Sequence, residues 1–233
     1  MRISGLQKMT LLDYPGKIAC TVFLGGCNFR CPFCHNGELL DSGAESIMDE
    51  QELLEFLSKR RGLLDAVCIS GGEPALQKDL APFLEKVKQM GYLIKLDTNG
   101  SRPEVLKWLA ESKLLDYVAM DIKNSPERYV QTAGAAVQME KVEESIRYLL
   151  EDHVDYELRT TVVAQLHDAD EISRMGEWVT SLAAGKKAKR WFLQPFADRE
   201  TVLYAGLSAP DEAQLAEFAG ILSCYSSLSS IRG

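Results

Sequence analysis

Short apolar runs rich in β-branched residues alternate with helix-like patterns along most of this chain. The runs have the length of buried strands, and the intervening patterns repeat their apolar positions about every three to four residues. The six predicted strands span Ile18–Leu24, Asp65–Ser70, Tyr92–Asp97, Tyr117–Ile122, Tyr156–Val163 and Arg190–Gln194. The predicted helices span Asp49–Arg61, Lys78–Met90, Pro103–Ser112, Met139–Glu151, Ala169–Ala183 and Pro210–Ser223.

Regular strand–helix alternation indicates parallel strands, so the chain is expected to form a barrel or a doubly wound sheet. Six units fall short of the eight in a closed barrel. Asp49 and Asp168 can cap their helices, and Pro103 and Pro210 suit first-turn positions. Periodicity alone leaves an open barrel and a flat sheet as alternatives.

Length and composition favour one domain over residues 1–233. The chain is 46% hydrophobic, enough to bury a substantial core, and shows no internal repeat, low-complexity tract or linker. No apolar run reaches the roughly 18 residues of a membrane span, and Met1–Lys8 has no signal-peptide core. Six cysteines without a secretory signal indicate cytoplasmic thiols and metal ligands.

The net charge of −8 argues against general nucleic-acid binding. Lys186–Arg190 is a local basic exception. We interpret it as a solvated loop before a strand, with a docking patch for an acidic partner as the alternative.

Three cysteines, Cys27, Cys31 and Cys34, fall within eight residues, with no fourth nearby. A closed zinc site requires four ligands, and an electron-transfer cubane cluster is usually held by four thiolates. Three thiolates would leave one iron of a cubane without a protein ligand, and an open metal position is a place for a substrate. The spacing therefore indicates a metal site that takes part in a reaction rather than one that only stabilises the fold.

The sequence also allows two simpler interpretations of the cysteine segment. Spacings of four and three residues also place the cysteines on one helix face, although Pro32 and the preceding Gly25–Gly26 favour a loop. A zinc knuckle would need a second cysteine pair, and Cys68 and Cys224 are singletons. Cys20 and Cys68 lie in predicted strands, where small buried thiols are common.

The CxxxCxxC pattern, with an aromatic before its last cysteine, resembles the radical S-adenosylmethionine (SAM) enzymes. Leu12–Gly16, then Thr21–Leu24, then the loop ending Cys34-His35-Asn36 resemble the glycyl-radical-enzyme activating enzymes, most closely those of anaerobic ribonucleoside-triphosphate reductase. The resemblance runs from about Leu12 to Phe196. It favours a partial (β/α)6 TIM-like barrel of parallel strands.

The resemblance implies a [4Fe-4S] cluster on Cys27, Cys31 and Cys34, whose open iron binds S-adenosylmethionine. The reduced cluster cleaves this cofactor to methionine and a 5′-deoxyadenosyl radical, which abstracts a hydrogen from a glycine of a glycyl radical enzyme. His35 is expected to pack beside the cluster. No side chain needs to act as a general acid or base.

Gly71, Gly72 and Glu73 follow the second predicted strand. Paired glycines let a backbone approach a ligand closely, and Glu73 can accept hydrogen bonds from an ammonium. An ordinary strand-to-helix turn would use the same residues. By resemblance, this element holds the methionine amino group of the cofactor.

The next two strands end in Asp97-Thr98 and in Asp121 and Lys123. Turn and capping chemistry is the alternative for each. Lys123 suits the carboxylate of a bound methionine, and Asp121 would help to hold its ammonium. The resemblance also implies a monovalent cation near Asp97, Thr98 and Asp121.

Arg159 on the fifth strand is, by resemblance, a contact to the ribose or carboxylate. Gln194 on the sixth would lie beside the adenine, with Phe33 contributing its backbone and ring. Relatives often have a histidine where this chain has Ala197.

The expected partners are a glycyl radical enzyme and a flavodoxin or ferredoxin-type reductant, with no nucleic acid or membrane. The gap from Gly37 to Asp49 contains no cysteine, which argues against a second cluster. One alternative is a radical SAM enzyme acting on a small molecule, such as a 7-carboxy-7-deazaguanine synthase-like enzyme. Another is a non-catalytic metal-binding adaptor, which would bind zinc and no iron.

Overall fold

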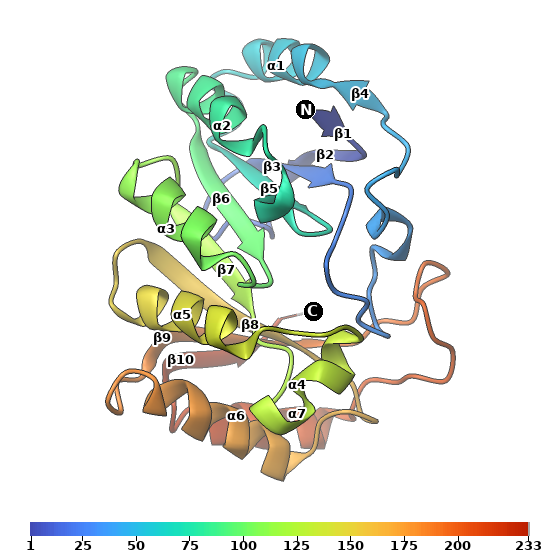
Figure 1. Ribbon diagram of the computed structural model, residues 1–233, viewed down its shortest axis with the longest axis vertical. Helices are drawn as coiled ribbons and strands as arrows, with labels where there is room; N and C mark the ends of the chain where they lie inside the picture. The colour runs from blue at the N-terminus through green and yellow to red at the C-terminus, as the bar shows by residue number, and fades with distance from the viewer. Residues whose placement is uncertain (233) are drawn as a thin grey trace. The chain divides into compact units, whose positions relative to one another are not determined.

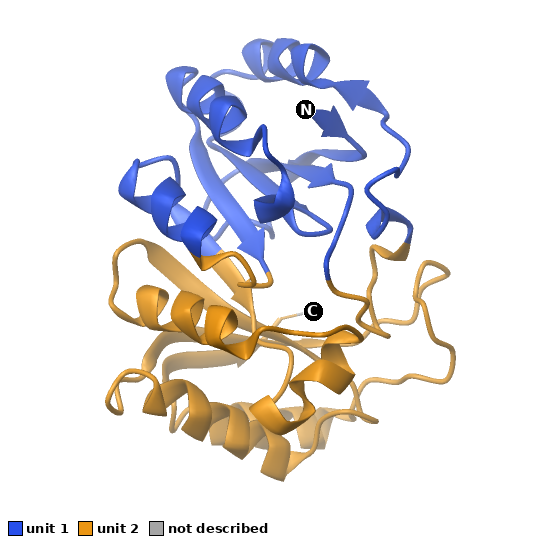
Figure 2. Cartoon of the chain, in the orientation of Figure 1, with its two compact units in different colours: residues 1–28, 38–98, 104–118 blue, residues 29–37, 99–103, 119–233 orange. Residues whose placement is uncertain are grey.

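A computed structural model describes residues 1–232 and divides them into two compact units. Unit 1 comprises residues 1–28, 38–98 and 104–118, and unit 2 comprises residues 29–37, 99–103 and 119–233 (Figure 2). The labels of Figure 1 are used for helices and strands. None of the helices in the described part of the chain is long and apolar enough to cross a membrane.

Unit 1 is built on a sheet with the order β2-β3-β5-β6. Strands β3, β5 and β6 are parallel, and β2 pairs antiparallel with β3. Its strands are β1 (Arg2–Ile3), β2 (Gly5–Thr10), β3 (Ala19–Leu24), β4 (Met48–Asp49), β5 (Ala66–Gly71) and β6 (Leu93–Thr98). Its helices are α1 (Glu50–Lys59), α2 (Leu80–Gln89), most of α3 (Pro103–Glu111) and the 3-10 turns η1 (Gly37–Leu39) and η2 (Pro74–Leu76).

Strand β7 (Tyr117–Asp121) contributes residues to both units, and the strand order of unit 2 is β7-β8-β9-β10. Strands β8, β9 and β10 are parallel. The strands are β8 (Asp155–Val162), β9 (Ala188–Pro195) and β10 (Ser226–Ile231). The helices are α4 (Pro126–Ala133), α5 (Met139–Leu150), α6 (Ala169–Ser181) and α7 (Glu212–Leu222) (Figure 1).

Near-continuous apolar runs make β3 and β5 the centre of the core of unit 1. Ala66, Val67, Cys68 and Ile69 are all fully buried, as is Cys20 on β3. Strands buried on both faces lack the polar alternation of half-exposed ones, because neither side chain row meets water. Each predicted strand and helix is present, with ends that differ by a few residues.

Helix caps explain where several helices begin. Asp49 forms a capping box with Glu52, and the Asp168 side chain accepts a hydrogen bond from the Glu171 backbone, as predicted. The prediction for Pro210 is wrong. Asp211 caps α7 through a capping box, so Pro210 lies before the cap rather than in the first turn.

The last described residues contain a strand that the sequence patterns did not predict. Residues Ser226–Ile231 form β10, which pairs with β9 in the sheet of unit 2. Arg232 then donates a 2.8 Å hydrogen bond to the buried carboxylate of Glu157. The basic stretch is only partly a loop, because Ala188–Arg190 begin β9, and Arg190 pairs with Asp155 at 2.9 Å.

Candidate functional site

The cysteine segment is a loop whose backbone forms hydrogen bonds within each of the two units. Cys27 belongs to unit 1, where its N–H donates to the Leu40 carbonyl at 3.0 Å. Cys31 and Cys34 belong to unit 2, where the Cys34 N–H closes a turn onto the Cys31 carbonyl at 3.1 Å. The absence of helix between residues 25 and 36 removes the reading of the cysteines as a helical stripe.

Two opposing effects act on the thiols of Cys31 and Cys34. Burial raises the pKa of both, and the nearby Lys123 ammonium acts in the opposite direction. A bound cationic metal deprotonates a coordinating thiol outright, so burial without metal does not count against a ligand role. Soft thiolate donors beside a lysine suit an iron–sulfur cluster.

Within residues 1–232, no three His, Cys, Asp or Glu side chains are grouped to hold one metal ion. A cubane binds each of its thiolates to a different iron, so its ligands need not converge on one point. The chemistry of the donor set therefore fits a cluster better than a single ion.

Gly71 and Gly72 bring the end of β5 against the start of the cysteine loop. A Cβ on Gly71, whose φ is +113°, would lie 2.4 Å from the Leu24 backbone, and one on Gly72 would lie 2.2 Å from the Gly26 carbonyl oxygen. The Glu73 N–H donates to that same Gly26 carbonyl at 2.8 Å. The two glycines are thus required for backbone packing directly before Cys27.

The Glu73 side chain is buried and oriented by its own unit. Its Oε1 accepts hydrogen bonds from the Ala75 N–H at 3.0 Å and from the Thr98 hydroxyl at 2.8 Å. The structure therefore brings three predicted site residues of unit 1, Gly72, Glu73 and Thr98, into one connected arrangement. The Ala75 contact also caps η2, so the turn chemistry considered as an alternative is present as well.

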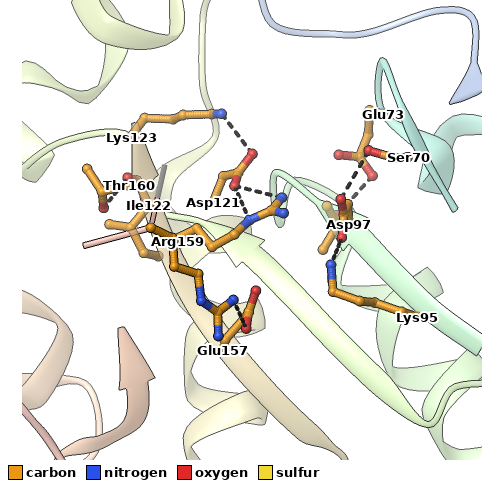
Figure 3. Close-up of polar contacts among 12 residues, drawn as sticks. Ser70, Glu73, Lys95, Asp97, Asp121, Ile122, Lys123, Glu157, Arg159 and Thr160 are labelled. Carbon is orange, nitrogen blue, oxygen red and sulfur yellow. Dashed lines mark hydrogen bonds and ion pairs between the residues drawn. The ribbon is translucent and has the colours of Figure 1, made fainter. Parts of the chain in front are cut away.

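Asp97 on β6 lies between two donors of unit 1. Ser70 Oγ donates to its Oδ2 at 3.1 Å, and Lys95 Nζ lies 2.5 Å from its Oδ1 (Figure 3). Lys95 and Asp97 are two residues apart on a strand, so their side chains share a face. Sequence reasoning missed Lys95, although this spacing within a strand pattern is a usable signal.

In unit 2, two cations share the Asp121 carboxylate. Lys123 Nζ lies 3.0 Å from Oδ2, and Arg159 Nε lies 3.1 Å from Oδ1 (Figure 3). Burial alone would lower the pKa of Lys123, but Asp121 and Cys31 outweigh it, so this pKa lies above its usual value. The lysine is therefore a fixed cation. Its Nζ also lies 5.9 Å from the centre of the buried Phe33 ring.

Gln194 near the end of β9 lies opposite Thr161 in the β8–β9 register. It is partly buried, and the exposed Ala197 follows three residues later. His35 packs against Phe196, with ring centres 5.8 Å apart. Burial lowers the pKa of His35, which favours the neutral ring.

Three contacts that position this group have no signal in the sequence. His167 Nε2 lies 2.9 Å from the Lys123 carbonyl. Thr201 Oγ1 donates to the His35 carbonyl at 2.5 Å, and the Tyr204 N–H donates to the Pro32 carbonyl at 3.2 Å. The loop after β9 therefore holds the cysteine loop within unit 2.

Residues 21–175 match the sequence profile of the Radical SAM superfamily. A Methanocaldococcus jannaschii protein, provisionally named a glycyl-radical enzyme activating enzyme, is 31% identical over 232 residues, covering 96% of this chain and 92% of its own. The pyruvate formate-lyase-activating enzyme of Listeria monocytogenes is 26% identical, covering 78% of this chain and 77% of its own.

A solved domain of the pyruvate-formate lyase-activating enzyme from Bacteroides vulgatus superposes with a TM-score of 0.59 at 23% identity, covering 72% of this chain and 99% of that domain. This likeness confirms the predicted α/β fold, a partial barrel of parallel strands. The chain belongs to the radical SAM superfamily and is an enzyme of its glycyl-radical-enzyme activating class. Membership implies S-adenosylmethionine and a [4Fe-4S] cluster as cofactors.

Proposed function

We propose that this enzyme activates an anaerobic ribonucleoside-triphosphate reductase by removing a hydrogen atom from the α-carbon of one glycine. The similarity to glycyl-radical enzyme activating enzymes supports a protein substrate of this kind. The choice of reductase rests on the resemblance of Leu12–Gly16 and of the cysteine loop to that branch. Radical chemistry at a peptide glycine also accounts for a site without a His-centred acid–base pair.

In this proposal, Cys27, Cys31 and Cys34 would hold the cluster, and S-adenosylmethionine would bind at the position that these cysteines leave open. The bound, reduced cluster would supply the one electron needed to cleave the sulfonium to methionine and a 5′-deoxyadenosyl radical. Gly71 and Gly72 hold the backbone before Cys27, and Lys123 supplies a cation beside Cys31. These residues bind and orient the cofactors.

The observation that carries the cofactor assignment is the set of charged side chains at the strand ends of each unit. In unit 1, Glu73 and Asp97 are two carboxylates with one ammonium, Lys95. In unit 2, Lys123 and Arg159 are two cations on one carboxylate. The methionine end of S-adenosylmethionine carries an ammonium and a carboxylate, so it needs one site of each sign.

We assign the remaining contacts on that basis. Gly71–Glu73 receive the amino group, with help from Asp121, and Lys123 and Arg159 receive the carboxylate. Phe33 and Gln194 contact the adenosine end. The monovalent cation expected near Asp97, Thr98 and Asp121 stays a prediction.

The proposal also includes the setting of the reaction. We expect residues 1–233 to act as one domain in the cytoplasm, with a flavodoxin or ferredoxin-type protein delivering the electron. An open cubane iron decays in air, so activity requires low oxygen.

The test is electron paramagnetic resonance on the partner. The cluster-loaded, reduced protein is mixed without oxygen with S-adenosylmethionine and an anaerobic ribonucleotide reductase from the same genome. The expected result is a glycyl radical signal on the reductase, absent from a variant whose radical-site glycine is replaced by alanine. Cofactor cleavage with a small-molecule substrate, and no glycyl radical, would contradict the proposal.

A further inference from the structure

Lys95 is a buried ammonium in the middle of β6. Its side chain is 1% exposed and lies among the largest fully buried side chains of the described chain. Lysine is almost never fully buried unless it is paired, because a desolvated ammonium is costly. Its partner is Asp97, at 2.5 Å, two residues further along the same strand.

Both carboxylate oxygens of Asp97 already have donors from unit 1. Lys95 Nζ contacts Oδ1, and Ser70 Oγ donates to Oδ2 at 3.1 Å. The neighbouring Thr98 hydroxyl donates to Glu73 at 2.8 Å. The oxygens that a cation would use here are therefore engaged by groups of the chain itself.

A monovalent cation bound to Asp97 would lie beside the Lys95 ammonium. Repulsion between like charges is poorly screened away from solvent, so the two cations would compete for one carboxylate. The residues present therefore do not fit a metal cation at Asp97, in contrast to the expectation from the family resemblance. The ammonium has the same charge and, as a donor, satisfies the same oxygen.

We propose that the Lys95 ammonium takes the place of the monovalent cation, so that this enzyme binds its cofactor independently of potassium and sodium. Lys95 is a positioning residue. It fixes Asp97, and through Ser70 it fixes the end of β5 that leads into Gly71 and Gly72. The inference rests on the proposed function only for the identity of the cofactor that this strand end receives.

The first experiment measures cation binding by the wild-type protein without any turnover. Sodium-23 relaxation is followed while potassium chloride replaces choline chloride at constant ionic strength. The expected result is no saturable sodium site that potassium displaces. A saturable, potassium-competed site in the wild type that Lys88→Met keeps would overturn the proposal.

The second experiment compares variants by equilibrium dialysis with S-adenosylmethionine. Wild-type affinity is expected to be the same in potassium and in choline. Lys95→Met should bind about tenfold more weakly in choline, since a charge-assisted contact is lost, and potassium should restore the affinity by occupying the vacated position at Asp97. Lys88→Met, which breaks the partly buried pair with Asp116, is the matched control and should stay independent of cation.

Lys95→Leu, which also removes the ammonium, serves as the second variant if Lys95→Met fails to fold. A folded Lys95 variant whose affinity does not respond to potassium would overturn the proposal and leave Lys95 with a structural role alone. Failure of the wild type to bind S-adenosylmethionine would instead count against the proposed function. The sodium measurement distinguishes the two failures, because it needs no cofactor.

Discussion

Two Lys–Asp pairs, one in each unit, use the same residue types at the same spacing in different surroundings. Lys95 and Asp97 of unit 1 are 1% and 14% exposed, and Ser70 occupies the second carboxylate oxygen. Asp121 of unit 2 is 28% exposed and is shared by Lys123 and Arg159. The Asp97 carboxylate accepts hydrogen bonds from two side chains of its own unit, whereas the Asp121 carboxylate contacts two cations, one of which lies near Cys31.

The difference indicates separate tasks for the two pairs. A buried pair stabilises the strand end on which it lies, so its loss should lower stability first and cofactor affinity through the displaced strand end. A partly exposed carboxylate that contacts two cations can receive an anionic group beside them, so loss of one cation should lower cofactor affinity with little effect on folding. The variants below test this division, beginning with the largest expected effect.

Replacing Cys31, whose thiol lies near Lys123 and Asp121, should remove the cluster altogether. Cys31→Ala is expected to assemble no intact cubane, because two thiolates remain where three are needed. Iron and sulfide content and the visible absorption of the reconstituted protein measure this. Cys68→Ala, at a buried thiol of β5, is the control and should keep full iron content. Full iron content and cofactor cleavage in Cys31→Ala would remove Cys31 from the ligand set.

Lys95→Met tests the buried pair through stability. Removing one partner of a buried ion pair leaves an uncompensated charge on Asp97, so the free energy of unfolding should fall by about 3–5 kcal/mol. Urea denaturation of the cluster-free protein in choline chloride measures it. The double variant Lys95→Met/Asp97→Asn should recover part of the loss. A loss of unfolding free energy equal to that of Lys88→Met would show that the buried Lys95–Asp97 pair contributes no more to stability than the Lys88–Asp116 pair.

Lys123→Met tests the partly exposed pair through binding. The cluster should form normally, and the affinity for S-adenosylmethionine should fall roughly 10- to 100-fold, since a hydrogen bond to a charged group is worth about 1.5–3 kcal/mol. Equilibrium dialysis of the iron-loaded variant measures it. Lys86→Met, at a surface pair with Glu50, is the control. Unchanged affinity would exclude Lys123 from the cofactor site.

The smallest expected effect is that of Thr201→Val, which removes the hydrogen bond to the His35 carbonyl but keeps the side-chain shape. The loss should be about 1 kcal/mol of stability, with faster bleaching of the cluster in air because the loop after β9 is held less firmly. Thr201→Ser retains the hydroxyl and should behave as the wild type. Equal bleaching rates in all three proteins would separate this loop from cluster protection.

Local patterns in the sequence predicted the strands, most helix starts and the cysteine loop. The spacing of apolar residues, the helix caps and the position of Pro32 depend only on residues that are close in sequence, so they were sufficient to predict these elements. Helix α4 was missed even though Pro126 and Gly134 mark its two ends. The polar residues of β10 concealed a strand that depends on pairing with β9.

In the candidate site too, contacts between residues close in sequence could be predicted, whereas contacts between distant residues could not. Lys95 is two residues from Asp97 on one strand, so its pairing was open to inference from the sequence. The Thr201–His35 contact joins residues 166 positions apart and exists only in the folded chain. Gly72 was expected to let the backbone approach a ligand, and the close neighbour that the structure shows is the Gly26 carbonyl of the protein itself.

The most direct test of the account is the formation of 5′-deoxyadenosine. The protein is reconstituted with iron and sulfide without oxygen, reduced and supplied with S-adenosylmethionine, and the product is measured by chromatography. The account predicts product that disappears when Cys27, Cys31 or Cys34 is replaced by alanine and persists in Cys68→Ala. No product from a protein with a verified intact cluster, even with its reductase partner present, would contradict it.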